Sequence, residues 1–93
     1  MAKERQIENK LKKEVEMVGG LCLKFTSPGM AGVPDRLVLL SGARIYFVEL
    51  KTPGKKLRPL QLKRKNQLES LGFTVYVIDS YKGIEDFLQE VVE

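Results

Sequence analysis

The sequence contains no histidine and only one cysteine, Cys22. The missing histidine excludes Ser-His-Asp hydrolysis, Cys-His proteolysis and zinc sites built on imidazole. The single cysteine excludes an internal disulfide framework and is compatible with a reducing compartment. A general base must therefore be Lys, Asp, Glu or a metal-bound water. Any metal site must use oxygen ligands, which favour Mg²⁺, Mn²⁺ or Ca²⁺.

Long hydrophobic runs are absent too. No apolar run approaches the ~20 residues that span a bilayer, and the charged start MAKERQIENK lacks a signal-peptide core. We therefore expect no membrane association and an intracellular, cytoplasmic location. A length of 93 residues, of which 43% are hydrophobic, predicts one globular domain over residues 1–93.

Positive charge is distributed unevenly over this chain of formal net charge +4. Between positions 51 and 65 there are seven basic residues and no acidic one: Lys51, Lys55, Lys56, Arg58, Lys63, Arg64 and Lys65. Such a field suits a polyanion such as a phosphate backbone, although a basic run can also be a plain solvated face. Lys24 and Arg36 are further candidates for phosphate contact, with the same alternative.

The pattern of apolar residues predicts three helices and four strands. Helical spacing covers residues 4–18, 59–71 and 80–92, and alternating or β-branched runs cover residues 21–25, 34–40, 45–51 and 73–79. The run FTVYVID is β-branched and aromatic throughout, which predicts a central strand. The order is α-β-β-β-α-β-α, an α/β fold with a mixed sheet flanked by helices.

Three charged residues interrupt the two apolar strands of the stretch GVPDRLVLLSGARIYFVELK: Asp35, Glu49 and Lys51. Alternation along a strand sends Glu49 and Lys51 to the same face. A three-residue turn at positions 41–43 would pair residue 40 with residue 44, and hence Asp35 with Glu49; a two-residue turn would send Asp35 to the other face. The alternative is that these are ordinary strand-end charges that reach water.

Two carboxylates opposite each other repel unless a positive charge lies between them. A divalent cation with oxygen ligands satisfies Asp35 and Glu49 and gives the pair a purpose. Lys51 would then lie beside the metal-bound water, where it could orient the water towards a phosphorus atom or take its proton. The arrangement predicts hydrolysis of a phosphodiester without histidine.

These motifs resemble those of a known nuclease family. Pro34-Asp35 followed by Glu49-Leu50-Lys51 resembles the PD-(D/E)xK pattern, and the element order resembles the restriction-endonuclease-like core of that superfamily. More narrowly, GMAGVPDRLVL, YFVELKTP and LRPLQLKRKNQLESLGF resemble the VRR-Nuc (virus-type replication-repair nuclease) family, in its stand-alone phage and bacterial form.

The resemblance implies a role for each matched residue. Asp35 and Glu49 would bind Mg²⁺, or Mn²⁺ as a substitute, with the Leu50 carbonyl as a third ligand. Lys51 would be the catalytic lysine, and Gln61 would support the site from the second helix. A first-helix glutamate near the metal would be Glu8, with Glu4 as a weaker candidate, and both could be ordinary helix charges. Whether one or two metals bind stays open.

Gln61 also has support from helical geometry, because it lies on the apolar side of its helix with Leu60 and Leu71. The alternative is a glutamine at the helix edge that reaches solvent.

Stand-alone relatives are associated with four-way DNA junctions. The resemblance therefore implies a structure-selective endonuclease of DNA repair or recombination that resolves Holliday junctions as a homodimer, and a possible phage origin within a bacterial host. The alternatives are a flap or nonspecific DNA nuclease, a non-catalytic nucleic-acid-binding module with the same fold, and an interaction protein whose basic helix meets an acidic partner.

Overall fold

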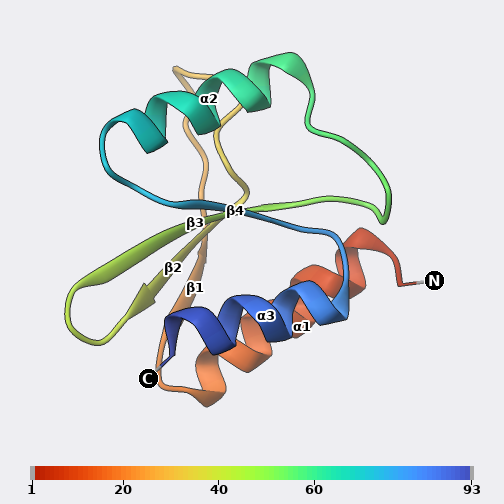
Figure 1. Cartoon of the computed structure of the whole chain (residues 1–93), viewed down its shortest axis with the longest axis vertical. Helices are drawn as coiled ribbons and strands as arrows, with labels where there is room; N and C mark the ends of the chain where they lie inside the picture. Colours follow the sequence, from red (N-terminus) through yellow and green to blue (C-terminus); the bar gives the residue numbers. More distant parts are fainter. Residues whose placement is uncertain (1, 93) are drawn as a thin grey trace.

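The computed structural model describes residues 2–92 and contains the predicted order of elements (Figure 1). Their bounds are α1 Glu4–Met17, β1 Leu21–Lys24, β2 Arg36–Leu40, β3 Arg44–Leu50, α2 Pro59–Ser70, β4 Val75–Ile78 and α3 Tyr81–Val91. The α/β fold class is confirmed. None of the helices within residues 2–92 is long and apolar enough to cross a membrane.

The four strands form one mixed sheet in the order β1-β2-β3-β4. Strands β1 and β2, and likewise β2 and β3, pair in antiparallel fashion. Strand β4 pairs parallel to β3 after the α2 crossover. The prediction that residues 73–79 form a central strand is wrong, because β4 is at the sheet edge. Within residues 2–92 no strand follows β4 to pair with its free side, and Val77 on this strand is 43% exposed.

The turn between β2 and β3 has the predicted length of three residues. Leu40 pairs with Arg44, and the pairing continues from there to Arg36 and Val48. Gly42 and Ala43 both adopt positive φ angles, of 81° and 59°. Glycine adopts this conformation without strain, and a single alanine accepts it at a cost of about 1–2 kcal/mol.

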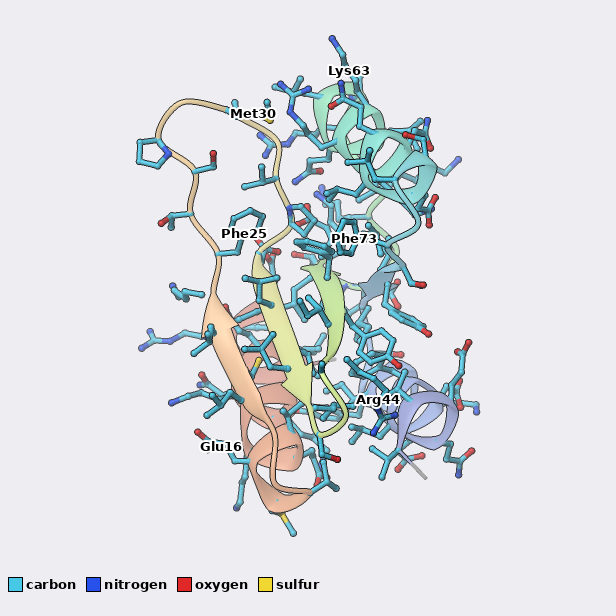
Figure 2. The ribbon with its side chains drawn as sticks, turned by 90° about the vertical axis from the view of Figure 1, so that its left-hand side faces the viewer. Glu16, Phe25, Met30, Arg44, Lys63 and Phe73 are labelled. Carbon is cyan, nitrogen blue, oxygen red and sulfur yellow. The ribbon has the colours of Figure 1, made fainter. Side chains whose placement is uncertain are left out.

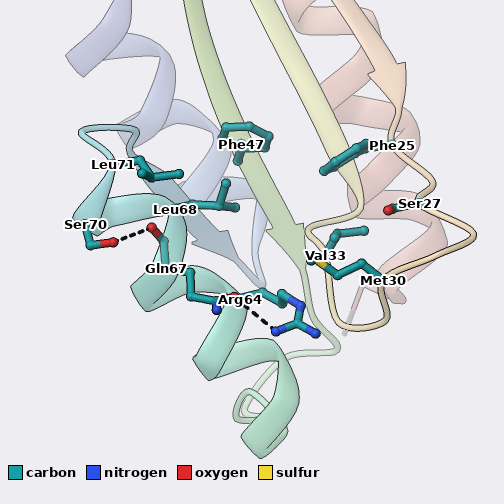
Figure 3. A pocket seen from close by; sticks show the side chains of 10 residues that line it. All are labelled: Phe25, Ser27, Met30, Val33, Phe47, Arg64, Gln67, Leu68, Ser70 and Leu71. Atoms are coloured by element: carbon teal, nitrogen blue, oxygen red, sulfur yellow. Dashed lines mark hydrogen bonds between the residues drawn. The ribbon is translucent and has the colours of Figure 1, made fainter.

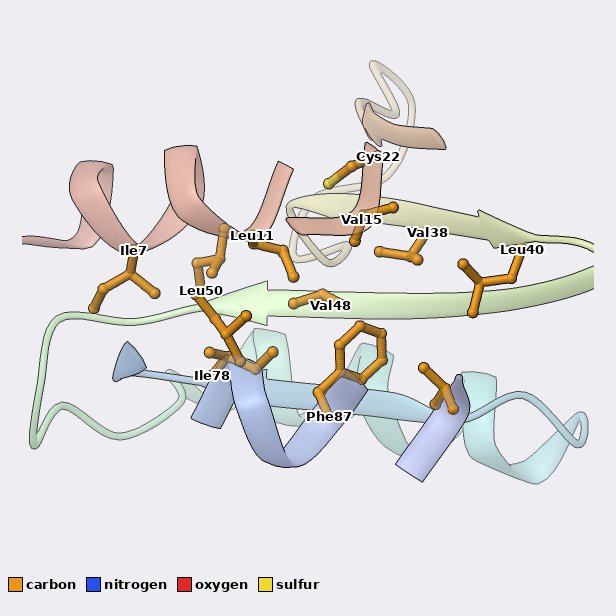
Figure 4. Close-up of a cluster of buried hydrophobic side chains, with 12 residues drawn as sticks. Ile7, Leu11, Val15, Cys22, Val38, Leu40, Val48, Leu50, Ile78 and Phe87 are labelled. Atoms are coloured by element: carbon orange, nitrogen blue, oxygen red, sulfur yellow. The ribbon is translucent and has the colours of Figure 1, made fainter. Parts of the chain in front are cut away.

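The hydrophobic core lies between the sheet and the two helices α1 and α3, which cover the same face (Figure 1). Each helix brings one stripe of fully buried side chains at helical spacing. The core residues of the cluster shown in Figure 4 are Ile7, Leu11, Val15, Cys22, Val38, Leu40, Val48, Leu50, Ile78, Ile84, Phe87 and Val91.

Helix α2 lies on the opposite face of the sheet, and it buries none of its residues (Figure 1). Leu60 is 41% exposed, and Leu71, directly after the helix, is 73% exposed. The apolar side that the sequence predicts for this helix is therefore not packed into a core. The helix is an attachment to the sheet and contributes little to its hydrophobic stabilisation.

Gly20 lies where α1 turns into β1, and the packing leaves no room for a side chain there. A Cβ atom would lie 2.7 Å from Leu40 Cδ2 and 2.8 Å from the Leu39 carbonyl oxygen. We expect Gly20→Ala to lower the free energy of unfolding by about 1–3 kcal/mol, because overpacking of this kind forces the backbone to move. Urea denaturation measures the change.

The matched control is Gly29→Ala, because a Cβ at Gly29 would meet no atom within 4 Å. Equal stabilities of the two variants would contradict the close packing of the α1–β1 connection.

Candidate active site

Asp35 and Glu49 lie at the same end of the sheet, on the face that α2 partly covers. The register that pairs Arg36 with Val48 sets Asp35 opposite Glu49 at the next position. The Asp35 carboxylate is held in place, because its Oδ2 accepts a hydrogen bond of 2.8 Å from the Leu50 backbone N–H. The Asp35 carbonyl accepts another from the Phe25 N–H, at 2.9 Å.

Among residues 2–92, the buried charged side chains are those of Arg36 and Glu49. Glu49 is only 3% exposed, and neither of its carboxylate oxygens has a hydrogen-bond partner among the described residues. Burial, and after it the nearby negative charge of Asp35, raise the pKa of Glu49 to about 8. A buried carboxylate without a partner is costly, so this group needs either a proton or a cation.

The chemistry of these donors fits a hard divalent cation. Asp35 and Glu49 offer carboxylate oxygens, and a cation between them would satisfy the orphaned oxygens of Glu49. Residues 2–92 contain no cluster of three or more His, Cys, Asp or Glu that could hold a metal. A backbone carbonyl can serve as a further protein ligand, and the predicted candidate is that of Leu50.

Lys51 follows β3 two positions after Glu49. Its backbone N–H donates to the Ile78 carbonyl at 3.0 Å, so the pairing of β3 with β4 continues through this residue. Continued alternation keeps the Lys51 side chain on the face of Glu49, where the sequence predicts it. The side chain is half-buried.

Glu8 lies on the opposite side of the sheet from the Asp35–Glu49 pair, in contact with Arg36. Arg36 Nε donates to Glu8 Oε2 at 2.8 Å, and its Nη1 donates to the Cys22 carbonyl at 3.1 Å. Successive residues of a strand point to opposite faces of the sheet, so the neighbouring side chains of Asp35 and Arg36 face opposite ways. The structure thus places Glu8 in an ion pair and does not bring it to the two carboxylates.

Arg36 does not fit its predicted contact with a DNA phosphate. It is 7% exposed, and its guanidinium is already bound to Glu8 and to the Cys22 carbonyl. The phosphate contact and the alternative of a solvated surface charge both assume that Arg36 reaches solvent. Alternation instead directs it towards α1, where the acidic side of that helix compensates its charge.

Glu4, the weaker first-helix candidate, lies one turn closer to the N-terminus of α1 and is exposed. Its Oε2 is 3.4 Å from the hydroxyl of Thr52, the residue after Lys51. The start of α1 therefore approaches the end of β3 that carries Glu49 and Lys51.

Gln61 is half-buried near the start of α2, and its polar group has a local partner. Its Oε1 accepts a hydrogen bond of 2.9 Å from the Arg58 backbone N–H, which satisfies one of the free amides at the helix N-terminus. This cap accounts for a glutamine at the third position of the helix. A contribution of Gln61 to the carboxylate site stays a prediction.

The remaining basic candidates lie on α2, on the loop before it and on β1. Lys24, Lys55, Lys56, Arg58 and Lys63 are exposed, and no ion pair joins them to a described residue. Figure 2 shows Lys63 pointing away from the sheet. Lys65 pairs with Glu69 at 3.0 Å, and Arg64 Nε donates to the Ala31 carbonyl at 2.9 Å.

Arg64 and Gly32 together hold α2 against the loop of residues 26–33, a connection that the sequence did not reveal. A Cβ at Gly32 would lie 2.8 Å from Leu60 Cγ, and Gly32 has a φ of 85°. The sequence signal for this close approach is Gly32 itself, two positions before the Pro34-Asp35 pair. Beside the contact, a cavity of about 490 Å³ opens between α2 and the loop, with Phe25, Met30, Phe47 and Leu68 among its walls (Figure 3).

Comparisons with known proteins agree with this geometry. No family model matches the sequence. A protein of Acyrthosiphon pisum secondary endosymbiont phage 1, named "Putative nuclease p44", is 49% identical over 80 residues, which are 86% of each chain. A solved structure described as "VRR_NUC domain" is similar with a TM-score of 0.88 and 34% sequence identity, over the full length of both chains. The chain belongs to the VRR-Nuc family.

Membership of the VRR-Nuc family confirms the resemblance that the three motifs carry. The likeness covers the whole chain, so the family fold includes α3 as well as the motif-bearing strands. The roles of individual residues in this VRR-Nuc chain rest on the geometry described above.

The raised pKa of Glu49 predicts how stability depends on pH in the absence of metal. Between about 4.5, the ordinary value, and about 8, the folded chain holds a proton that the unfolded chain has lost. The free energy of unfolding should therefore fall as pH rises through this window, by up to about 1.4 kcal/mol per pH unit. Urea denaturation in EDTA from pH 5 to pH 8 measures this slope.

Glu49→Gln removes the titrating group and should flatten this part of the profile. Glu85→Gln, which changes an exposed carboxyl of α3, should leave the slope as it is in the unmodified chain. A Glu49→Gln variant with an unchanged slope would show that Glu49 titrates normally.

Proposed function

We propose that this VRR-Nuc protein is an endonuclease that hydrolyses DNA phosphodiester bonds and depends on Mg²⁺ or Mn²⁺. The observation that carries the proposal is the pair of Asp35 and Glu49, in which Glu49 is buried with both oxygens unpartnered. A fold alone has no use for such a pair, because it lowers stability. The name of the phage relative, which calls that protein a nuclease, supports the same function.

Asp35, Glu49 and the Leu50 carbonyl would hold the cation. When bound, it would stabilise negative charge on the phosphate and on the leaving oxygen. Asp35 is already oriented for this role, because the Leu50 N–H fixes its carboxylate. Glu49 must lose its proton before it can bind, so cation binding should release a proton below about pH 8.

Lys51 acts on the attacking water. The water oxygen forms a bond to phosphorus and its proton passes to Lys51 or to solvent, while the bond from phosphorus to the leaving oxygen breaks and the leaving oxygen takes up a proton from solvent. Lys51 either takes that proton as a neutral amine or, as an ammonium, holds the water in line with the phosphorus. Because the chain has no histidine, a side-chain nitrogen base at this site must be a lysine, and Lys51 lies two positions after Glu49.

Gln61 and a first-helix glutamate would support this site from the side. Glu8 can reach a cation only if Arg36 gives up its ion pair, because the two side chains are 2.8 Å apart. Glu4 has no such constraint, and its contact with Thr52 places it beside the end of β3. Glu4 is therefore the better supported of the two for a helix-borne ligand.

Branched DNA is the substrate that we propose, with resolution of four-way junctions in repair or recombination by a homodimer. Such junctions have two-fold symmetry, so a two-fold dimer would present one site to each of two strands. Cleavage of flaps or of DNA without structural preference is the second candidate. It is favoured by the exposed lysines around α2, which contact backbones without regard to shape.

Cleavage assays with labelled four-way junction, flap and linear duplex test the proposal directly. We expect cleavage with Mg²⁺ or Mn²⁺ and none with EDTA. Asp35→Asn, Glu49→Gln and Lys51→Ala should each lower the cleavage rate by about 10²-fold or more, the range of lost acid–base or charge-stabilising groups. The matched controls, Asp86→Asn and Lys82→Ala, change an exposed pair on α3 and should keep full activity.

If none of the three substrates is cut with either metal, the proposed endonuclease activity is refuted. Cleavage confined to flaps would refute junction resolution, and it would leave the site assignment intact. The three site variants should still bind DNA, since the basic residues on and before α2 are unchanged.

The exposed lysines before α2 predict the salt dependence of binding. Neutralising two phosphate contacts by the double change Lys55→Ala and Lys56→Ala should reduce the slope of log K against log salt by about 1.8, at about 0.9 per contact with duplex DNA. Fluorescence anisotropy with duplex at several salt concentrations measures the slope. A double change of Lys12 and Lys13 to Ala on α1, at two exposed lysines on the opposite side of the sheet, should leave it unaltered.

A further inference from the structure

One face of the sheet carries a second apolar surface that no helix or strand within residues 2–92 covers. The side chains that share the face of Glu49 form three rows across the strands β1, β2 and β3. The first row is Leu21, Leu39 and Ile45, and the second is Leu23, Leu37 and Phe47. The third row is Phe25, Asp35 and Glu49, by continuation of the same register. We call the residues Leu21, Leu23, Leu37, Leu39 and Ile45 the open face.

Three of the five residues of the open face are exposed to solvent. Leu21 is 55% exposed, Ile45 is 44% exposed and Leu23 is 43% exposed. Helices α1 and α3 cover the opposite face, and α2 stands over the other end of this one (Figure 1). In Figure 2, Phe25 and Phe73 mark the end that α2 shields. An apolar surface of this kind indicates a binding surface.

The open face has the wrong chemistry for DNA. Neither of its rows contains a charged side chain, whereas the exposed lysines cluster before and on α2. Nucleic-acid binding begins with cations that contact phosphates, and it uses aromatic side chains to stack on bases. Leucine and isoleucine on a flat sheet serve neither purpose.

We propose that the open face is the surface through which two copies of this chain associate. The inference rests on the proposed homodimer and adds the place where its subunits meet. Two chains of net charge +4 repel wherever their charged surfaces approach. The open face is an uncharged surface on which identical copies can meet without this repulsion. A two-fold contact also requires a surface that complements itself, as two flat apolar sheet faces do.

The position of α2 makes room for a second sheet. Packed sheets lie about 10 Å apart, and a helix is about 10 Å in diameter. Helix α2 therefore forms a layer about as thick as a packed sheet. Beside this helix, the open face has room for one further layer of the same thickness. A second sheet, turned end for end, fills this space and places each α2 against the hairpin end of the other copy.

This arrangement sets the relation between the two catalytic rows. Along the chain, Asp35 lies three positions before the midpoint between Leu37 and Leu39, which is the centre of the open face. At about 3.4 Å per residue, a two-fold axis through that centre separates the two carboxylate pairs by roughly 20 Å along the strands. Both pairs then belong to one assembly and can act on two strands of the same DNA.

Sedimentation velocity over a range of concentrations tests the interface, with no DNA or metal present. The unmodified chain should sediment as a dimer of the 10.6 kDa chain. Ile45→Lys, and independently Leu21→Lys, should raise the dissociation constant by about 30-fold or more, as expected for a residue central to an interface. The control is Met17→Lys, which changes a methionine of α1 that is 71% exposed on the opposite side of the sheet, and it should not alter dimerisation.

A monomeric unmodified chain, or a dimer that survives both Ile45→Lys and Leu21→Lys, would overturn the interface. Circular dichroism shows that each variant is folded, and Leu21→Lys at an exposed edge-strand position guards against misfolding of Ile45→Lys. Failure of the proposed nuclease is read separately, because loss of metal-dependent cleavage leaves the sedimentation result unchanged.

Discussion

The pairing register of β2 and β3 is the constraint on which both the core and the site depend. Because the three-residue turn pairs Leu40 with Arg44, Val38 and Val48 point into the core while Asp35 and Glu49 point to the other face. A shift by one residue would exchange these sets, burying the carboxylates in the core and exposing the valines. The hydrophobic effect that drives core formation therefore also aligns the two carboxylates, and no separate interaction is needed to assemble the pair.

The site is held together in spite of its own electrostatics. Glu49 is buried beside a second carboxylate, and its raised pKa records the cost of charging it there. Contacts of the surrounding strands offset this cost. The Leu50 amide fixes Asp35 by a hydrogen bond. Phe47, two residues from Glu49, packs between Phe25 and Phe73, with ring centroids 5.8 and 5.4 Å apart. A cation between the two carboxylates would relieve the repulsion.

The sequence was sufficient for features that depend on local pattern. Alternation and the length of the turn predicted the hairpin and its register, and helical spacing predicted the stripe of Ile7, Leu11 and Val15. Position within the sheet was not predictable for β4, because a β-branched run is compatible with both a central and an edge strand. The burial of Arg36 was missed for a related reason, since its partner Glu8 is 28 residues away and only the tertiary fold brings them together.

Helix α2 has a consequence for the local dynamics of the chain. It buries no residue, and its contacts with the rest of the chain include the Arg64 hydrogen bond to the Ala31 carbonyl and the close approach of Leu60 to Gly32. A segment with so little buried apolar surface opens at a small fraction of the free energy that unfolds the core. Its amide hydrogens should exchange with solvent as a separate cooperative unit, while those of β2 and β3 exchange only on global unfolding. Helix α2, which carries basic residues, is thus the element with a low free energy of local opening. Bound DNA can therefore change its conformation without disturbing the strands that hold the carboxylates.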